Sequence, residues 1–245
     1  RTPCNVLTTV AAAAPVTDAM VVLDPGHGGS DPGAVSPGGL AESGVNLEVA
    51  RYTKAALEAA GVSVLLTRNA DYDLALAPRA ELARALQPQA FVSLHHNAEP
   101  DGPRASPGSE TYYQIASPAS KRLAGLIYEE IVAALSAYSV PWMADSDAGA
   151  KYRQGTRGDY YAMLRLPGSV VSVLTEAAFI SNPAEAELLA QPEFQRVEGE
   201  AVARGILRYL TTRDPGSGFT EPYPRVDPPR NPNAPQAPAC REPQL

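Results

Sequence analysis

Residues 20–34 read MVVLDPGHGGSDPGA, an apolar run that ends in an aspartate and continues into a glycine-rich turn. The apolar residues 20–24 predict a short buried strand, and the glycines allow tight turns and the close approach of a ligand. His27 lies inside this turn. The segment matches neither GxGxxG nor GxxxxGK[ST], and it lacks the lysine of a phosphate-binding loop. Taken alone, the turn leaves two interpretations open: a metal or catalytic site, or a plain structural turn.

The other two histidines also follow an apolar run, in AFVSLHHNA at residues 90–98. Neutral imidazole is a common zinc ligand, and strand ends followed by turns are places where sites are built. Adjacent residues of a strand point to opposite faces. Only one of His95 and His96 is therefore expected to enter a given site, and the other is expected to be a core residue.

The remaining chain alternates between strand-like and helix-like segments. We predict strands at 20–24, 62–68, 90–95, 109–115 and 169–179, and helices at 45–61, 78–87, 117–138, 182–190 and 192–210. This order indicates a single α/β domain with a mixed, mostly parallel central sheet of about six strands and helices on both faces. We expect an N-terminal extension over 1–19, a folded domain over 20–212 and a proline-rich tail over 213–245 that is extended or disordered.

Composition disfavours several classes of function. The net charge is −7 and no run of lysine or arginine occurs, which argues against nucleic-acid binding. No apolar stretch approaches the roughly 20 residues that span a bilayer. The chain starts at Arg1 without the pattern of a signal peptide, so we interpret it as a mature or trimmed chain.

The two cysteines, Cys4 and Cys240, lie near opposite ends of the chain. They are either two unrelated free thiols or a disulfide. Exposed free thiols would be reactive, and the ends of a domain often lie close together, so we favour the disulfide. A disulfide would imply an oxidising, exported setting, which means secretion to the periplasm or the cell wall.

Three carboxylates complete the candidate site. Glu42 precedes the first long helix, where an acid also stabilises the helix dipole. Glu176 ends a strongly apolar strand, where a carboxylate is costly to bury unless it is paired, for example with Arg68, or belongs to a site. We favour a site. Asp24 either supports the His27 loop or caps the turn.

These segments occur in the order of a known family: DPGHGGSDPGA (24–34), Glu42, LTR (66–68), SLHHNA (93–98), ETYY (110–113) and LTEAAFISN (174–182). Over roughly 20–212 the chain resembles the zinc-dependent N-acetylmuramoyl-L-alanine amidases of the amidase-3 type, which hydrolyse peptidoglycan. It looks most similar to short, secreted, mycobacterial-like actinobacterial members that lack a wall-binding module. The resemblance therefore implies an amidase catalytic domain.

The resemblance implies one zinc ion held by His27, Glu42 and His95, with Glu176 as the catalytic glutamate. Zinc-activated water would cleave the amide bond between the lactyl group of N-acetylmuramic acid and L-Ala of the stem peptide, with Glu176 as general base. His95 is chosen over His96 because the family motif has its ligand directly after the apolar pair. The expected partners are peptidoglycan or muropeptide fragments, bound by a monomer.

Two departures from the family pattern leave questions open. His96 stands where the family usually has a small residue, so it is either a substrate contact or a group that supports a zinc ligand. Ser43 replaces a frequent lysine, which should change local charge and not ligation. Asn97 and the 98–109 loop are expected to form the rim of the substrate groove. The connection 139–168 is too short and polar for an inserted blocking helix, so we predict an open groove.

Two other functions use the same residues. A zinc peptidase that cuts within the stem peptide would employ two histidines and a glutamate, but the chain lacks HExxH. A catalytically silent wall-binding module would be expected to have lost a ligand or the catalytic glutamate, and no such loss is visible in the sequence.

Overall fold

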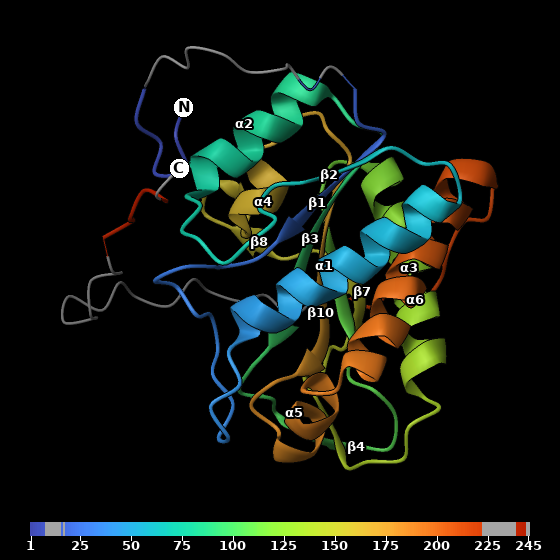
Figure 1. Ribbon diagram of the computed structural model, residues 1–245. Helices are drawn as coiled ribbons and strands as arrows, with labels where there is room; N and C mark the ends of the chain where they lie inside the picture. Colours follow the sequence, from blue (N-terminus) through green and yellow to red (C-terminus); the bar gives the residue numbers. More distant parts are fainter. Residues whose placement is uncertain (8–15, 17, 222–238, 244–245) are drawn as a thin grey trace.

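A computed structural model describes residues 1–7, 16, 18–221 and 239–243 (Figure 1). The strands are β1 Val21–Pro25, β2 Val64–Leu66, β3 Ala90–Asn97, β4 Gly102–Arg104, β5 Glu110–Tyr113, β6 Trp142–Ala144, β7 Gly149–Lys151, β8 Gln154–Gly155, β9 Gly158–Asp159 and β10 Ser172–Phe179. The helices are α1 Glu42–Ala59, α2 Leu76–Leu86, α3 Pro118–Leu135, α4 Ala162–Arg165, α5 Pro183–Leu189 and α6 Pro192–Thr211.

Six strands form the central sheet in the order β2-β1-β3-β10-β5-β7. The first four are parallel, β5 is antiparallel to β10, and β7 is parallel to β5. The prediction of a mixed, mostly parallel six-stranded sheet is confirmed. In this arrangement the carboxyl ends of β1, β3 and β10 meet at one edge of the sheet, where loops carry functional residues.

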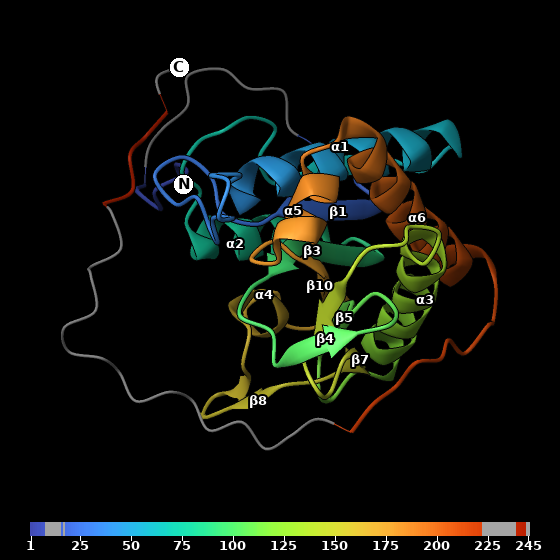
Figure 2. The ribbon, with the colours of Figure 1, turned by 90° about the horizontal axis from the view of Figure 1, so that it is seen from below.

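Helices cover both faces of the sheet, as predicted (Figure 2). Helix α6 packs against both α1 and α3, and the three helices cover one face, over a core that includes Val21, Leu23 and Val92. Helices α2 and α4 lie on the other face, where Val22 and Phe91 join a smaller core with Met163. The side chains of β1 and β3 thus alternate between two cores, which explains why 21–23 and 90–92 are apolar at every position.

Helix starts follow local capping chemistry. The Ser117 side chain accepts a hydrogen bond from the Ser120 N–H at the start of α3, and Asn182 does the same for Ala184 at the start of α5. Helix α1 begins at Glu42, three residues earlier than predicted, so Glu42 is its first residue rather than a residue before it. This change matters because it fixes the position of a candidate ligand at a helix N-terminus.

The connection 139–168 contains short strands and no helix longer than the four residues of α4. A blocking helix is therefore absent from this segment, as predicted. Beyond α6, residues 214–221 dock on the domain, which the sequence did not predict. Phe219 packs edge-on against Tyr113, and Ala150 of β7 exchanges hydrogen bonds with Gly218 and Thr220. Tail residues 222–238 lie outside the described residues.

A disulfide joins Cys4 and Cys240, whose Cα atoms lie 5.6 Å apart. The predicted pairing is therefore present in the structure. The helices of the described residues are all too short or too polar to cross a membrane.

Candidate active site

Three side chains from separate elements meet at the carboxyl edge of the sheet. His27 comes from the loop after β1, Glu42 from the first turn of α1 and His95 from β3, and their ligand atoms all lie within 4.8 Å of one another. Glu42 stands between the histidines, with Oε2 3.2 Å from Nε2 of His27 and Oε1 2.9 Å from Nδ1 of His95. Two imidazoles and one carboxylate are the donor set of a catalytic zinc site, which leaves a coordination position for water or substrate.

Two glycines provide the space for these donors. A Cβ atom on Gly26 would lie 2.1 Å from Cε1 of His95, and one on Gly33 would lie 2.5 Å from Oε2 of Glu42. His27 itself adopts a φ of 61°, a left-handed conformation that costs energy for a residue with a side chain. Such a backbone favours a functional loop over a plain structural turn.

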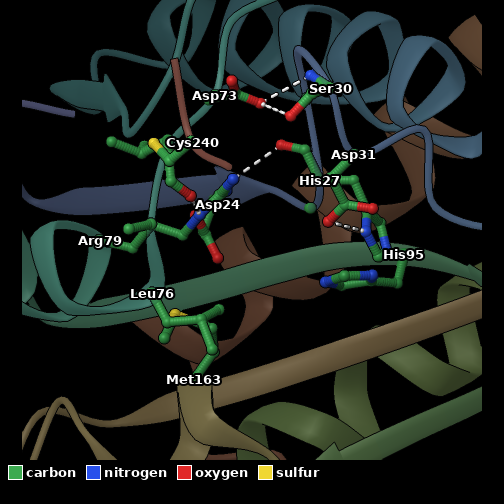
Figure 3. A pocket seen from close by; sticks show the side chains of 14 residues that line it. Asp24, His27, Ser30, Asp31, Asp73, Leu76, Arg79, His95, Met163 and Cys240 are labelled. Carbon is green, nitrogen blue, oxygen red and sulfur yellow. Dashed lines mark hydrogen bonds and ion pairs between the residues drawn. The ribbon is translucent and has the colours of Figure 1, made fainter. Parts of the chain in front are cut away.

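Asp31 orients His27. Its Oδ2 lies 2.8 Å from Nδ1 of His27, so the Nε2 atom is left to face Glu42 (Figure 3). A carboxylate that accepts from the second nitrogen of a histidine sets the tautomer and the ring position of a metal ligand. Sequence reasoning missed this role, although an acid four residues after the histidine of a turn was a usable signal.

Asp24 and Arg79 form a buried pair under the His27 loop. Nη1 of Arg79 donates to Oδ1 of Asp24 at 2.9 Å and to the Pro25 carbonyl at 2.7 Å, and Nη2 donates to the His27 carbonyl at 2.7 Å (Figure 3). Burial alone would raise the pKa of Asp24, but Arg79 and the hydroxyl donors of two neighbouring residues lower it overall. Asp24 therefore supports the His27 loop through Arg79, a residue that the sequence did not single out.

Glu176 lies on β10 in register with His95 of β3 on one side and Glu110 of β5 on the other. Side chains in register point to the same face of the sheet, so Glu176 shares the face of His95. Its Oε2 atom is buried and has no hydrogen-bond partner among the described residues. Burial raises the pKa of Glu176 well above its ordinary value, and the negative charges of Glu42 and Glu110 raise it further.

The alternative ion pair between Glu176 and Arg68 is wrong. The Arg68 guanidinium instead donates to the carbonyls of Pro25, Gly26 and Ser43, where it holds the strand end and α1 together. A carboxylate with one buried oxygen that has no partner among the described residues, next to a metal-type donor set, is a feature of a reaction site, because burial of such an oxygen is otherwise costly.

Comparison with known proteins agrees with this geometry. The sequence profile of a family described as N-acetylmuramoyl-L-alanine amidase matches residues 21–208. The chain belongs to the amidase-3 family. It is 34% identical over 223 residues to the N-acetylmuramoyl-L-alanine amidase AmiC of Neisseria meningitidis, covering 79% of this chain and 53% of that protein. The chain thus spans about half the length of this relative.

Two further relatives match over most of their length. The germination-specific N-acetylmuramoyl-L-alanine amidase of Bacillus subtilis is 32% identical, with 81% of this chain and 83% of the relative covered. The solved structure of the amidase AmiC2 of Nostoc punctiforme superposes with a TM-score of 0.65 at 34% identity, over 78% of this chain and 96% of that chain. The α/β fold seen here is thus that of amidase-3 catalytic domains.

In this amidase-3 family member, His96 lies on the opposite face of β3 from His95 and is buried. Its Nδ1 is 2.8 Å from Oδ1 of Asn46, and its Nε2 is 3.1 Å from Oε2 of Glu198 on α6. Nδ2 of Asn46 in turn donates to Oε1 of Glu42 at 3.1 Å. The burial excludes direct substrate contact by His96, and the bonds connect it to the Glu42 carboxylate.

Asn97 holds a second carboxylate beside the site. Its Nδ2 donates to Oε2 of Glu110 at 3.0 Å, and Glu110 also accepts from Nζ of Lys151 at 2.6 Å and from the Tyr112 hydroxyl at 2.6 Å. Burial raises the pKa of Glu110 although the Lys151 cation opposes the shift. Sequence reasoning quoted the ETYY segment but assigned no role to Glu110. The role of Asn97 and the 98–109 loop as a substrate rim stays a prediction.

Proposed function

We propose that this amidase-3 domain is a zinc-dependent N-acetylmuramoyl-L-alanine amidase that cleaves the amide bond between the lactyl group of N-acetylmuramic acid and L-Ala. The observation that carries the proposal is the unpartnered, buried oxygen of Glu176 on the face of the sheet that bears His95. His27, Glu42 and His95 would hold the ion, since their donor atoms are grouped closely enough for a single cation.

In the proposed reaction, some residues of the protein transfer a proton and others hold the proposed metal ligands in position. When bound, a zinc ion supplies Lewis acidity toward the scissile carbonyl and the attacking water. Glu176 accepts a proton from that water and passes it to the departing amine of L-Ala, a task for which a raised pKa suits a carboxylate. Asp31 keeps His27 in position, and Asp24 with Arg79 keeps the loop that carries His27 in place.

Zinc content and product analysis test the proposal together. Purified protein is expected to contain one zinc per chain and to release L-Ala–D-isoglutamine from muramyl dipeptide. Treatment with a chelator is expected to remove both the metal and the activity, and added zinc to restore them. Activity that persists after complete removal of the metal would refute the zinc mechanism. Cleavage within a longer stem peptide would instead support the peptidase, and zinc binding without turnover would support a wall-binding module.

Replacement of a ligand should remove the ion. His95→Ala deletes one of three donors, so we expect zinc affinity to fall by at least about 100-fold, and activity to fall to background. Metal analysis after dialysis against a competing chelator measures the affinity. Arg196→Ala is the control, because Arg196 makes only exposed ion pairs on α6. Stoichiometric zinc in the His95→Ala protein would contradict the ligand assignment.

We also propose that His96 positions Glu42 through Asn46. His96→Leu removes the partner of Asn46, and we expect zinc affinity to fall by about 10- to 100-fold, as for other groups that orient a ligand. The unfolding midpoint of the zinc-free protein is measured alongside, to separate ligand positioning from general destabilisation. Glu198→Gln should have the same direction of effect. Glu200→Gln is the matched control, because Glu200 lies on the same helix and, within the described part of the chain, bonds only to Arg196.

We propose that the enzyme is exported and acts on peptidoglycan or muropeptides, which the disulfide and the family support. That it acts as a monomer stays a prediction. The likeness to short actinobacterial members stays a prediction.

A further inference from the structure

The disulfide joins two segments near the ends of the chain, and one of its cysteines, Cys240, lines the cavity beside His27 and His95. We call residues 1–6 and 239–243, with the Cys4–Cys240 bond, the clip. Three contacts hold the clip to the domain: the Ala75 N–H donates to the Pro3 carbonyl at 2.9 Å, Arg1 pairs with Glu81 at 3.0 Å, and the Arg241 N–H donates to Asp73 at 2.6 Å. The clip is therefore anchored on α2 and on the loop before it.

Asp73 ties the clip to the loop that carries His27. Its Oδ2 accepts from the Arg241 N–H, while its Oδ1 accepts from both the backbone N–H and the hydroxyl of Ser30, at 2.6 and 2.7 Å. Figure 3 shows Cys240, Asp73, Ser30 and His27 around one cavity, with Asp73 next to Ser30. Asp73 thus links the clip to Ser30, which lies three positions after the proposed metal ligand His27.

The clip separates two cavities. The first, of about 560 Å³, lies beside His27 and His95 and has Cys240 in its wall. The second, of about 320 Å³, has Arg241, Glu242 and Pro243 in its wall. Ser30 and Asp73 line both cavities. The segment 240–243 and the hydrogen-bonded pair of Ser30 and Asp73 therefore form the partition between the two cavities.

The charged residues that line the two cavities favour the glycan part of a muramyl peptide over its stem peptide. Asp24, Asp31 and Asp73 line the first cavity. Asp71, Asp73 and Glu242 line the second, where Arg241 is the one cation among the described lining residues. Arg79 also lines the first cavity, but its guanidinium donates to Asp24 and to the carbonyls of Leu74, Pro25 and His27. Its hydrogen-bond donors are therefore engaged within the protein and do not attract a substrate carboxylate. The stem peptide carries free carboxylates, which these acids would repel, whereas sugar hydroxyls can donate hydrogen bonds to them. The groove therefore suits the glycan side of a muramyl peptide.

We propose that the clip is a specificity-determining wall that ends the glycan-side groove at Cys240. With the disulfide closed, the site accepts a muramic acid that has little or no glycan on this side. Without the disulfide, the segment 239–243 keeps the hydrogen bond of Arg241 to Asp73 and those of Glu242 to Thr2 and to the backbone N–H of residue 4. Loss of the covalent bond loosens this segment and opens the first cavity toward the second. This inference rests on the proposed amidase function.

A comparison of two substrates tests the wall. Wild type and the Cys4→Ser/Cys240→Ser variant are assayed on muramyl dipeptide and on a purified glycan oligomer that bears the same dipeptide. We expect the ratio of kcat/KM for oligomer over muramyl dipeptide to rise by about tenfold in the variant, as for removal of a steric block in a binding pocket. Glu81→Gln, which weakens the Arg1 contact and keeps the disulfide, should retain the wild-type ratio.

The ratio stays informative even if the variant is less stable, because a smaller folded fraction lowers both rates equally. An unchanged or lower ratio in the variant would overturn the clip as a wall while leaving the amidase function intact. A wild type that cleaves neither substrate would refute the proposed function itself.

Discussion

Glu176→Gln is expected to lower kcat on muramyl dipeptide by about 10³-fold while the protein keeps one zinc per chain. Glutamine has nearly the shape of glutamate but cannot accept the proton of the attacking water. Glu176 is not among the three donors grouped for the metal, so its replacement leaves that donor set complete. Release of L-Ala–D-isoglutamine under single-turnover conditions, together with zinc analysis of the same sample, measures both quantities.

The variant should fold at least as well as wild type. One buried oxygen of the Glu176 carboxylate has no partner among the residues that the structure describes, so the charge of Glu176 destabilises the folded state. Glu187→Gln, an acid on the surface of α5, is the control for loss of a negative charge. Turnover of Glu176→Gln within about tenfold of wild type would exclude Glu176 as the general base.

Arg79→Leu is expected to lower the free energy of unfolding by about 3–5 kcal/mol, because it leaves Asp24 as a buried charge without its cation. Four hydrogen bonds to Asp24 and to the carbonyls of Leu74, Pro25 and His27 are lost at the same time. Urea unfolding at pH 7 measures the loss. Arg84→Leu on the same helix is the control, since Arg84 is exposed and donates only to the Leu166 carbonyl.

The difference in unfolding free energy between wild type and Arg79→Leu is expected to depend on pH. The pKa of Asp24 is lowered from its ordinary value of 3.8, so its stabilising contribution is present above that value and is lost as the pH falls through the lower, folded-state pKa. In Arg79→Leu the carboxyl can take up a proton instead. The stability difference between the two proteins should therefore narrow toward acid pH, and a difference that widens would contradict the Asp24–Arg79 pairing.

Much of the site could be predicted because its residues lie in short motifs at strand ends and at a helix start. The alternation of a strand already required that His95 and His96 face opposite sides, and the structure confirms this. The resemblance, not the alternation, selected His95. Arg79 was missed because it lies in no motif, and Glu110 was missed because its motif, ETYY, names no chemistry by itself. An arginine in the middle of a helix gives no local sign that it will be buried under a loop 50 residues away.

The sequence by itself determined the alternating elements, the mixed sheet and the grouping of His27, Glu42 and His95. These depend on local periodicity, on glycines where no side chain fits, and on motifs whose order is specific to a family. Only the tertiary structure decided the partners of the buried polar groups. Burial requires that each such group be paired, but many donors elsewhere in the chain could satisfy that requirement. The pairing of Asp24 with Arg79, of His96 with Glu198 and of Asp73 with the clip followed from which helix and which loop were folded against the sheet.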